Sequence, residues 1–349
     1  MNVVTKQINI TLPLIPVTLR VPILLSFVTC LVFVLLFAST QGAFPISFIS
    51  LLQNNLTEQE QAVFLSIRLP RLLLAIVVGA ALAVSGATLQ GLFRNPLADP
   101  GLIGISSGSA FAVAIMIVLV GPASGFLGLY GLSFAAFLGC LTTSFVLFNV
   151  AKSNGIMSVT YILLAGIAVN ALAAAGTGFL TYLSDDQQIR TLTFWTMGSL
   201  GTTLWPSVII CSSIVLPACF LLYRNAHYLN ILILGEDEAK HLGVNSEKLK
   251  RKIIIYTALA IGGSVAVSGI IGFVGLVVPH LIRLTLGPDH RLLIPASALT
   301  GAILLIIADT IARTIVAPAE IPVGIFTSLI GGPFFLWLLI KQYSSRFGI

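Results

Sequence analysis

The chain has 349 residues, of which 57% are hydrophobic and only 9% are charged, and its formal net charge is +6. A soluble protein carries about 25% charged residues, so this composition excludes a soluble enzyme, a disordered chain and a nucleic-acid reader as the main interpretation. It indicates a membrane protein, with the lipid bilayer as one partner and no nucleic acid among the others.

Long runs without Asp, Glu, Lys or Arg divide the chain into segments that Gly, Pro and charged residues separate. About 20 apolar residues cross a bilayer as a helix. We therefore predict an all-α polytopic membrane protein with about ten transmembrane helices in a single domain, residues 1–349. We expect the first run to be a retained helix because it nearly fills a membrane span. The predicted spans are 21–39, 70–92, 101–120, 126–149, 157–182, 200–223, 253–270, 274–286, 293–316 and 322–340, with a Gly-Pro turn at 121–125.

An even number of spans places both termini on one side of the membrane, and the basic residues identify that side. Cytoplasmic loops are enriched in Lys and Arg, so we predict that both termini are cytoplasmic. This orientation leaves only Arg68, Arg71, Arg190 and Arg313 outside. The other basic residues, all inside, are Lys6, Arg20, Arg94, Lys152, Arg224, Lys240, Lys248, Lys250, Arg251, Lys252, Arg283, Arg291, Lys341 and Arg346.

The largest polar segment between spans, residues 224–252, is predicted to be cytoplasmic. The acidic run from Glu236 to Glu238 favours a helix N-terminus, and Gly243 is a typical C-terminal cap. Ser246 at a second N-cap predicts another short helix that runs towards the membrane. Two projecting helices would offer a surface to a partner protein. The alternative interpretation is a solvated loop.

An eight-residue pattern occurs twice, as GAALAVSG at 79–86 and GGSVAVSG at 262–269, with five identical positions and an offset of 183 residues. Five crossings separate the two copies, so they are predicted to run in opposite directions. Inverted repeats of this kind are common in transporters. We predict repeat halves at about 65–223 and 250–345, and the alternative is chance similarity between two helices rich in small residues.

Several kinds of chemistry are missing from the sequence. It contains no Gly-x-x-x-x-Gly-Lys-Ser/Thr phosphate loop, and neither its His nor its Cys residues have metal-ligand spacing. No nucleophile has a matched base, which argues against an intramembrane enzyme. Asp309 and Arg313 are four residues apart and are predicted to pair within the ninth span. A proton- or sodium-driven carrier is the less favoured alternative because few charges lie near the bilayer centre.

Five stretches together resemble the permease subunits of type II ATP-binding-cassette (ABC) importers, which carry iron chelates, haem or cobalamin. The pattern of 93–101 with 193–200 (TFWTMGSL) is most similar to the haem permeases, and siderophore or cobalamin permeases are the alternative. The five stretches are QGLFRNPLADP at 90–100 with GISSG at 104–108, RLPR at 68–71, GEDEAKHLG at 235–243, GFVGLVVPHLIR at 272–283, and 308–324 with GPFF at 332–335.

The resemblance implies a homodimer in the cell inner membrane, with two cytoplasmic ATPase subunits that use ATP and Mg, and a soluble substrate-binding protein outside. It implies no enzyme activity, cofactor or metal site in this chain. It favours a coupling helix over a solvated loop at 235–247. The residues expected to contact the ATPase subunit are Glu236, Glu238, Ala239, Leu242 and Gly243.

The resemblance also places Arg68, Arg71 and Arg313 opposite carboxylates of the docked binding protein. Arg190 has no such support from the resemblance. As a cation at the outer mouth, it is predicted to meet the propionates of haem or another anionic chelate. The alternative for all four arginines is anchoring to lipid headgroups, because long basic side chains extend readily to the membrane interface.

Overall fold

The computed structural model of the chain describes residues 15–53, 55–121, 125–153, 156–157 and 159–347. Ten helices in these ranges correspond to the ten predicted spans, so the prediction of an all-helical polytopic protein is confirmed. Seven are long and apolar enough to cross a bilayer and three are shorter. They are α1 (Val17–Thr40), α4 (Leu69–Leu92), α5 (Ile105–Ile115), α6 (Gly125–Val150), α7 (Val159–Leu183), α9 (Trp205–Arg224), α12 (Ser246–Ser268), α13 (Val274–Leu286), α14 (His290–Thr314) and α15 (Val323–Phe347).

Shorter elements connect these helices. A π-helical turn, η1, joins α3 to α4 without a break, and another, η3, extends α5. The connecting elements are α2 (Phe48–Leu52), α3 (Glu58–Val63), η1 (Phe64–Arg68), η2 (Pro100–Ile103), η3 (Met116–Val120), α8 (Asp186–Thr196), α10 (Ala226–Leu234), α11 (Glu236–His241), and the antiparallel strand pair β1 (Lys152–Ser153) and β2 (Ile156–Met157).

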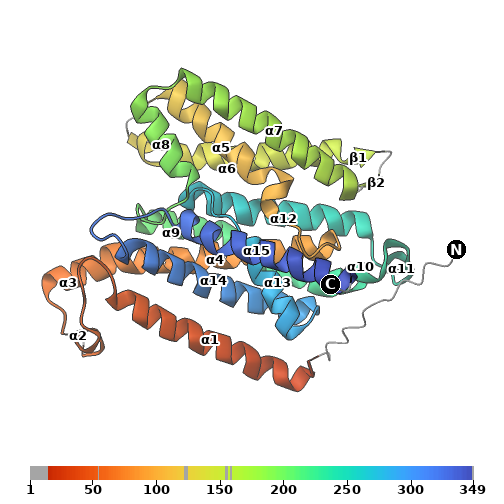
Figure 1. Cartoon of the computed structure of the whole chain (residues 1–349), viewed down its shortest axis with the longest axis horizontal. Coiled ribbons are helices and arrows are strands. Elements are labelled where there is room, and N and C mark those ends of the chain that lie inside the picture. Colours follow the sequence, from red (N-terminus) through yellow and green to blue (C-terminus); the bar gives the residue numbers. More distant parts are fainter. Residues whose placement is uncertain (1–14, 54, 122–124, 154–155, 158, 348–349) are drawn as a thin grey trace.

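The bundle is built around α4, which is buried along almost its whole length. Figure 1 shows α1 along one edge of the molecule and α5, α6, α7 and α8 on the opposite side. Glycines bring α4 into direct backbone contact with its neighbours: a Cβ on Gly79 would collide with the carbonyl of Gly301 in α14, and one on Gly86 with the carbonyl of Gly275 in α13. Small residues allow such close approach of helices in membranes.

The two copies of the eight-residue pattern lie on α4 and α12, which pack against each other in opposite directions. The last turn of α4 lies beside the start of α12, where Arg94 approaches Glu236 at 3.9 Å and Glu236 binds Lys250 at 2.7 Å. This arrangement is the one expected of an inverted repeat. The boundaries of the repeat halves stay a prediction.

Some details differ from the sequence-based expectations. Ser246 does not begin a separate short helix: Asn245 is the N-cap, its side chain accepts from the backbone of Lys248, and α12 continues unbroken into the membrane span. The sixth span begins at Trp205 rather than at residue 200. The centre of the predicted turn, 122–124, and both chain termini lie outside the described residues.

Candidate functional site

Charged side chains gather at the two ends of the helix bundle, and each end is a candidate site. Arg68, Arg71, Arg190 and Arg313 lie at one end, which we call the arginine end. The acidic helix α11 lies at the other, which we call the α11 end. Three of the four arginines are not surface residues: Arg68, Arg71 and Arg313 are only 4%, 5% and 7% exposed. The packing of α1, α4 and α14 covers them.

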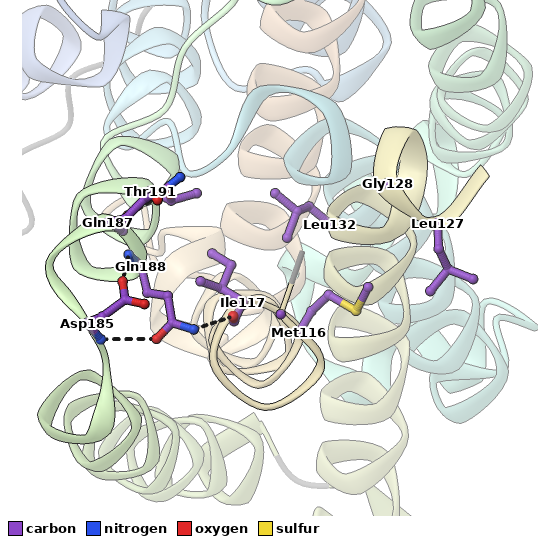
Figure 2. Close-up of a pocket in the computed structure, with 10 residues that line it drawn as sticks. Met116, Ile117, Leu127, Gly128, Leu132, Asp185, Gln187, Gln188 and Thr191 are labelled. Carbon is purple, nitrogen blue, oxygen red and sulfur yellow. Dashed lines mark hydrogen bonds between the residues drawn. The ribbon is translucent and has the colours of Figure 1, made fainter. Parts of the chain in front are cut away.

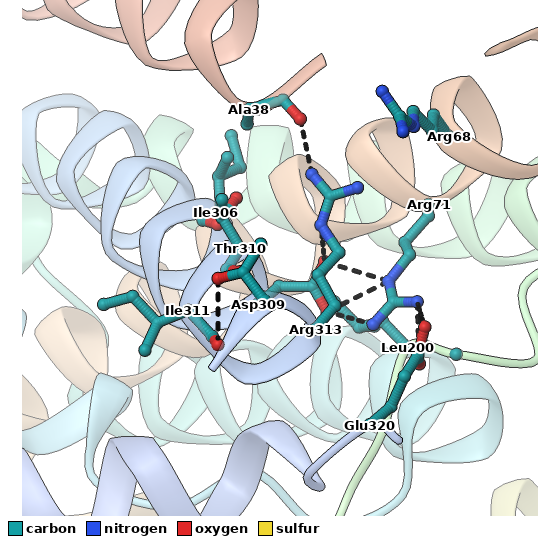
Figure 3. A network of polar contacts seen from close by, with 12 residues as sticks. Ala38, Arg68, Arg71, Leu200, Ile306, Asp309, Thr310, Ile311, Arg313 and Glu320 are labelled. Carbon is teal, nitrogen blue, oxygen red and sulfur yellow. Dashed lines mark hydrogen bonds and ion pairs between the residues drawn. The ribbon is translucent and has the colours of Figure 1, made fainter. Parts of the chain in front are cut away.

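Arg71, on the first turn of α4, is the centre of the arginine end (Figure 3). Its Nε and Nη2 donate to the carboxylate of Asp309 at 2.9–3.1 Å, and its Nη1 donates to both oxygens of Glu320 at 2.9 Å. Paired hydrogen bonds between a guanidinium and a carboxylate are among the strong polar contacts in proteins. Asp309 is 1% exposed, so it belongs to the protein interior.

Arg68 and Arg313 bind backbone carbonyls at the end of α1 and just after it. Arg68 donates to the carbonyls of Ser39 and Phe44, and Arg313 donates to the carbonyl of Ala38. The last carbonyls of a helix have no partner within the helix, and a cation there is favourable. Both arginines therefore tie the C-terminus of α1 to the bundle.

The predicted pair of Asp309 with Arg313 is present only as a loose contact, with 3.9 Å between the Asp309 carboxylate and Nε of Arg313. The main partner of Asp309 is Arg71, 238 residues earlier in the chain. Arg68 and Arg71 were expected to lie opposite carboxylates of a docked binding protein. In the structure both are buried and they bind different partners, so any docking protein has access to little of their surface.

Arg190 is exposed on α8, a helix that lies between two of the predicted spans and was not itself predicted. Its N-terminus is a capping box, in which Asp185 accepts from the backbone of Gln188 and the Gln188 side chain accepts from the backbone of Asp185. The pattern Asp-x-x-Gln is a recognised helix start and would have predicted α8. Gln188 also donates to the carbonyl of Ile117 in η3, which ties α8 to α5.

A cavity of about 260 Å³ lies between α8, η3 and the start of α6 (Figure 2). Its wall on α8 is polar and includes Gln188 and Thr191, and the opposite wall is apolar and includes Met116 and Leu132. A larger open hollow of about 540 Å³ lies nearby, lined by Thr196, Met197, Ile270, Gly272, Gly324, Ile325, Ser328, Leu329 and Pro333.

The α11 end is built on a short helix that projects between α10 and α12. Gly235 precedes α11, and Gly243 follows it with φ of +80°. The backbone of Val244 donates to Ala239 and that of Gly243 donates to Lys240. These two bonds form the Schellman C-cap that ends many helices, so the predicted cap at Gly243 is confirmed.

A buried lysine supports α11 from beneath. Lys250 in α12 is only 2% exposed, and its ammonium group binds Glu236 at 2.7 Å and Glu247 at 3.3 Å. Because Glu236 is the first residue of α11, this ion pair fixes the start of α11 to α12. Of the predicted coupling residues, Glu238, Leu242 and Gly243 are exposed, Glu236 is partly exposed, and Ala239 is fully buried. Ala239 therefore packs inside the chain and has no surface for a partner.

The stretch 90–100 lies at the same end and links α4 to α5. Gln90 donates to the carbonyl of Leu276 at 3.2 Å and accepts from Arg283 at 2.8 Å, so it joins α4 to α13. Asp99 caps η2 through the backbone N–H of Gly101 at 2.7 Å. Burial raises the pKa of Asp99, and that hydrogen bond partly offsets the rise. Among the described residues, no group of three His, Cys, Asp or Glu side chains is placed to hold a metal ion.

Comparisons with known proteins agree with this architecture. The FecCD transport family model matches residues 28–341. The chain is 50% identical to the hemin transport system permease protein HmuU of Yersinia pestis over 93% of this chain and 98% of the relative. It is 42% identical to the cobalamin import system permease protein BtuC of Halobacterium salinarum over 85% and 78% of the two chains.

A solved structure of an ABC transporter in an inward-facing conformation superposes with a TM-score of 0.83 at 35% identity, and covers 92% of this chain and 99% of the other. The family model covers most of the sequence, and the fold is shared with the solved structure over nearly the whole length. Together they assign the family. The chain belongs to the FecCD transport family and is a membrane-spanning permease subunit of an ABC importer, not itself the ATPase.

Proposed function

We propose that this permease imports haem. The observation that carries the proposal is the 50% identity to a hemin permease over nearly the full length of both chains. This chain is 40–42% identical to the cobalamin permease relatives, and the match covers 78–87% of their length. The hollow of about 540 Å³ at the arginine end, with mostly apolar walls and hydroxyl groups at Thr196 and Ser328, suits a flat apolar chelate with a polar edge.

The orientation follows from the basic residues. Arg94, Lys250 and Arg283 belong to the α11 end, and an excess of Lys and Arg marks the cytoplasmic side. The α11 end therefore faces the cytoplasm and the arginine end faces outside. Both termini are cytoplasmic, and the membrane is the cell inner membrane.

The α11 end suits an ATPase subunit as partner. Leu242 is 60% exposed next to the acidic side chains of α11, and an exposed Leu in an aqueous region favours burial against another protein. A helix with internal hydrogen bonds transmits a push as a rigid body. Two copies of the permease form a dimer, and each copy binds one ATPase subunit through Glu236, Glu238, Leu242 and Gly243.

The arginine end receives the substrate-binding protein. Arg71 is the guanidinium there that an acidic side chain of the partner would bind, and a guanidinium holds a carboxylate through paired hydrogen bonds. Arg190, exposed on α8, meets the carboxylates of the cargo. Arg190→Ala is expected to reduce uptake while docking of the binding protein is unchanged.

The test is uptake by purified components. The permease and its ATPase subunit are placed in proteoliposomes with the binding protein of the same importer, loaded with hemin, cobalamin or a ferric siderophore. We expect ATP-dependent accumulation of hemin at least tenfold above that of the other two cargoes. Preferential accumulation of cobalamin or the siderophore would overturn the haem assignment, and a permease without its ATPase subunit is the control for leakage.

A further inference from the structure

The two carboxylates that hold Arg71 differ sharply in their access to solvent. The Asp309 side chain is 1% exposed, whereas the Glu320 side chain is 43% exposed. Asp309 lies on α14 in the interior. Glu320 lies in the link between α14 and α15, so it is the outermost member of the network (Figure 3).

Arg71 leaves little room for a third carboxylate at that surface, because its side chain is only 6% exposed. Its Nε and Nη2 are taken by Asp309, and its Nη1 is taken by both oxygens of Glu320. Of these two acceptors Glu320 is the exposed one, so a carboxylate from another protein reaches Arg71 most directly at the position that Glu320 occupies. We infer that Glu320 is a displaceable carboxylate, which occupies Arg71 until an acidic side chain of the docking protein replaces it.

Gly201 provides the space in which the Glu320 carboxylate lies. A Cβ added to Gly201 would stand 2.7 Å from Oε2 of Glu320, closer than van der Waals contact allows. The atom that it meets is the end of a flexible side chain, which can move aside at little cost. Gly201, in the short link before α9, thus leaves room for the Glu320 carboxylate beside Arg71.

The inference rests on the proposed docking of a substrate-binding protein at the arginine end. It also concerns the effect that the negative charge of Glu320 has on that docking. A negative residue at a surface that receives acidic side chains would ordinarily repel them. Here Glu320 also keeps Arg71 neutralised while no partner is bound. Because one carboxylate replaces another, docking forms no net ion pair at Arg71, and this contact contributes little salt dependence.

The test measures docking of the fluorescently labelled binding protein of the same importer to the permease in nanodiscs. Glu320→Gln keeps the shape of the side chain but removes the competing charge. We expect a dissociation constant about fivefold lower than wild type, the factor that one exposed ion pair contributes. We also expect a steeper rise of that constant with salt, because docking then forms a new ion pair. Asp186→Asn is the matched control: it removes the same charge from an exposed site on α8 and should change the constant less than twofold.

A second variant moves Glu320 without changing any charge. Gly201→Ala should push the carboxylate off Arg71 and tighten docking in the same direction as Glu320→Gln. Docking that is unchanged or weaker in both variants, or tightened equally by Asp186→Asn, would overturn the inference and leave the proposed docking intact. If the wild-type permease does not bind the binding protein at all, the docking proposal fails first, and the inference fails with it.

Discussion

At the arginine end three guanidinium groups lie beneath the surface, whereas at the α11 end the acidic and apolar side chains of α11 project from it. The three buried outer cations bind partners within the chain, which are Asp309, Glu320 and the carbonyls at and just after the end of α1. At the other end a single buried cation, Lys250, holds the base of α11 and leaves its tip free to contact another protein.

The two ends therefore show two roles of charged residues, one in the stability of the fold and one in binding. Buried arginines that bind several helices at once hold those helices in place, and their removal is expected to cost stability. Exposed residues on a projecting helix contribute little to the fold, and their removal is expected to cost binding. Variants that alter one property without the other can test this distinction.

The largest effect is expected at Asp309. Asp309→Asn leaves Arg71 without its buried counter-ion, and removal of one member of a buried ion pair costs about 3–5 kcal/mol. We expect a matching loss in the free energy of unfolding, measured by denaturation in detergent micelles. Glu320→Gln, at the exposed partner, should cost less than about 1 kcal/mol. Equal losses for the two variants would contradict the distinction between an interior and a displaceable carboxylate.

A smaller effect, on binding alone, is expected at Leu242. Leu242→Asp places a charge on the exposed tip of α11 and should weaken association with the ATPase subunit about tenfold, since burial of a Leu side chain contributes about 1.5–3 kcal/mol. Thermal stability should not change. The single change is cleaner than one that includes Gly243, whose φ of +80° an Asp would adopt only with strain. Leu242→Met is the control and should bind as wild type does, and a loss of stability in Leu242→Asp would show that α11 has a structural role.

The smallest effect is a pH dependence at Asp289, which lies outside the membrane spans at the α11 end. Asp289 caps α14 and contacts Asn230 at 2.6 Å and Arg20 at 2.7 Å. Burial raises its pKa, but hydrogen bonds from Arg291 and Asn230 and the charges of Arg20 and Arg291 outweigh this and hold the pKa below its usual value.

A lowered pKa in the folded state means that the carboxylate stabilises the fold at any pH above its unfolded value of about 3.9. That contribution is lost as the pH falls through the lower folded value. Asp289→Asn should therefore be less stable than wild type at pH 7, and the gap should close as the pH falls below about 3.9. Unfolding curves of both proteins between pH 3 and pH 7 measure it, and a gap that is constant over this range would contradict the assignment.

The sequence predicted the helices well because their signal is local. The short span 274–286 has the bounds of α13, and the charged segment after it ends where α14 begins. The helix α8 was missed although Asp185 and Gln188 have capping-box spacing, because its net hydropathy gave no membrane signal. The start of α12 was misassigned because Asn245 and Ser246 are both good N-caps, and in the structure it is the Asn245 side chain that accepts from the backbone of Lys248.

The candidate site was harder to predict because its contacts join distant parts of the chain. Nothing near Arg71 in the sequence identifies Asp309 or Glu320 as its partners, and the spacing of Asp309 and Arg313 indicated a different pair. A charge at the end of an apolar run is compatible with a lipid headgroup, a docking protein or the interior. Only the arrangement of α1, α4 and α14 shows that Arg68, Arg71 and Arg313 are interior.

The glycine contacts of α4 have a mechanical consequence. Gly79 and Gly301 each meet the backbone of the other helix, and Gly86 meets that of Gly275, so α4 has no clearance in which to slide or roll against α13 or α14. These helices come from different predicted repeat halves, and the halves are therefore interlocked instead of free to rock apart. In the proposed dimer, we expect the pathway to open by displacement of one whole subunit against the other and by movement of peripheral helices such as α8, while α4, α13 and α14 move together as one block.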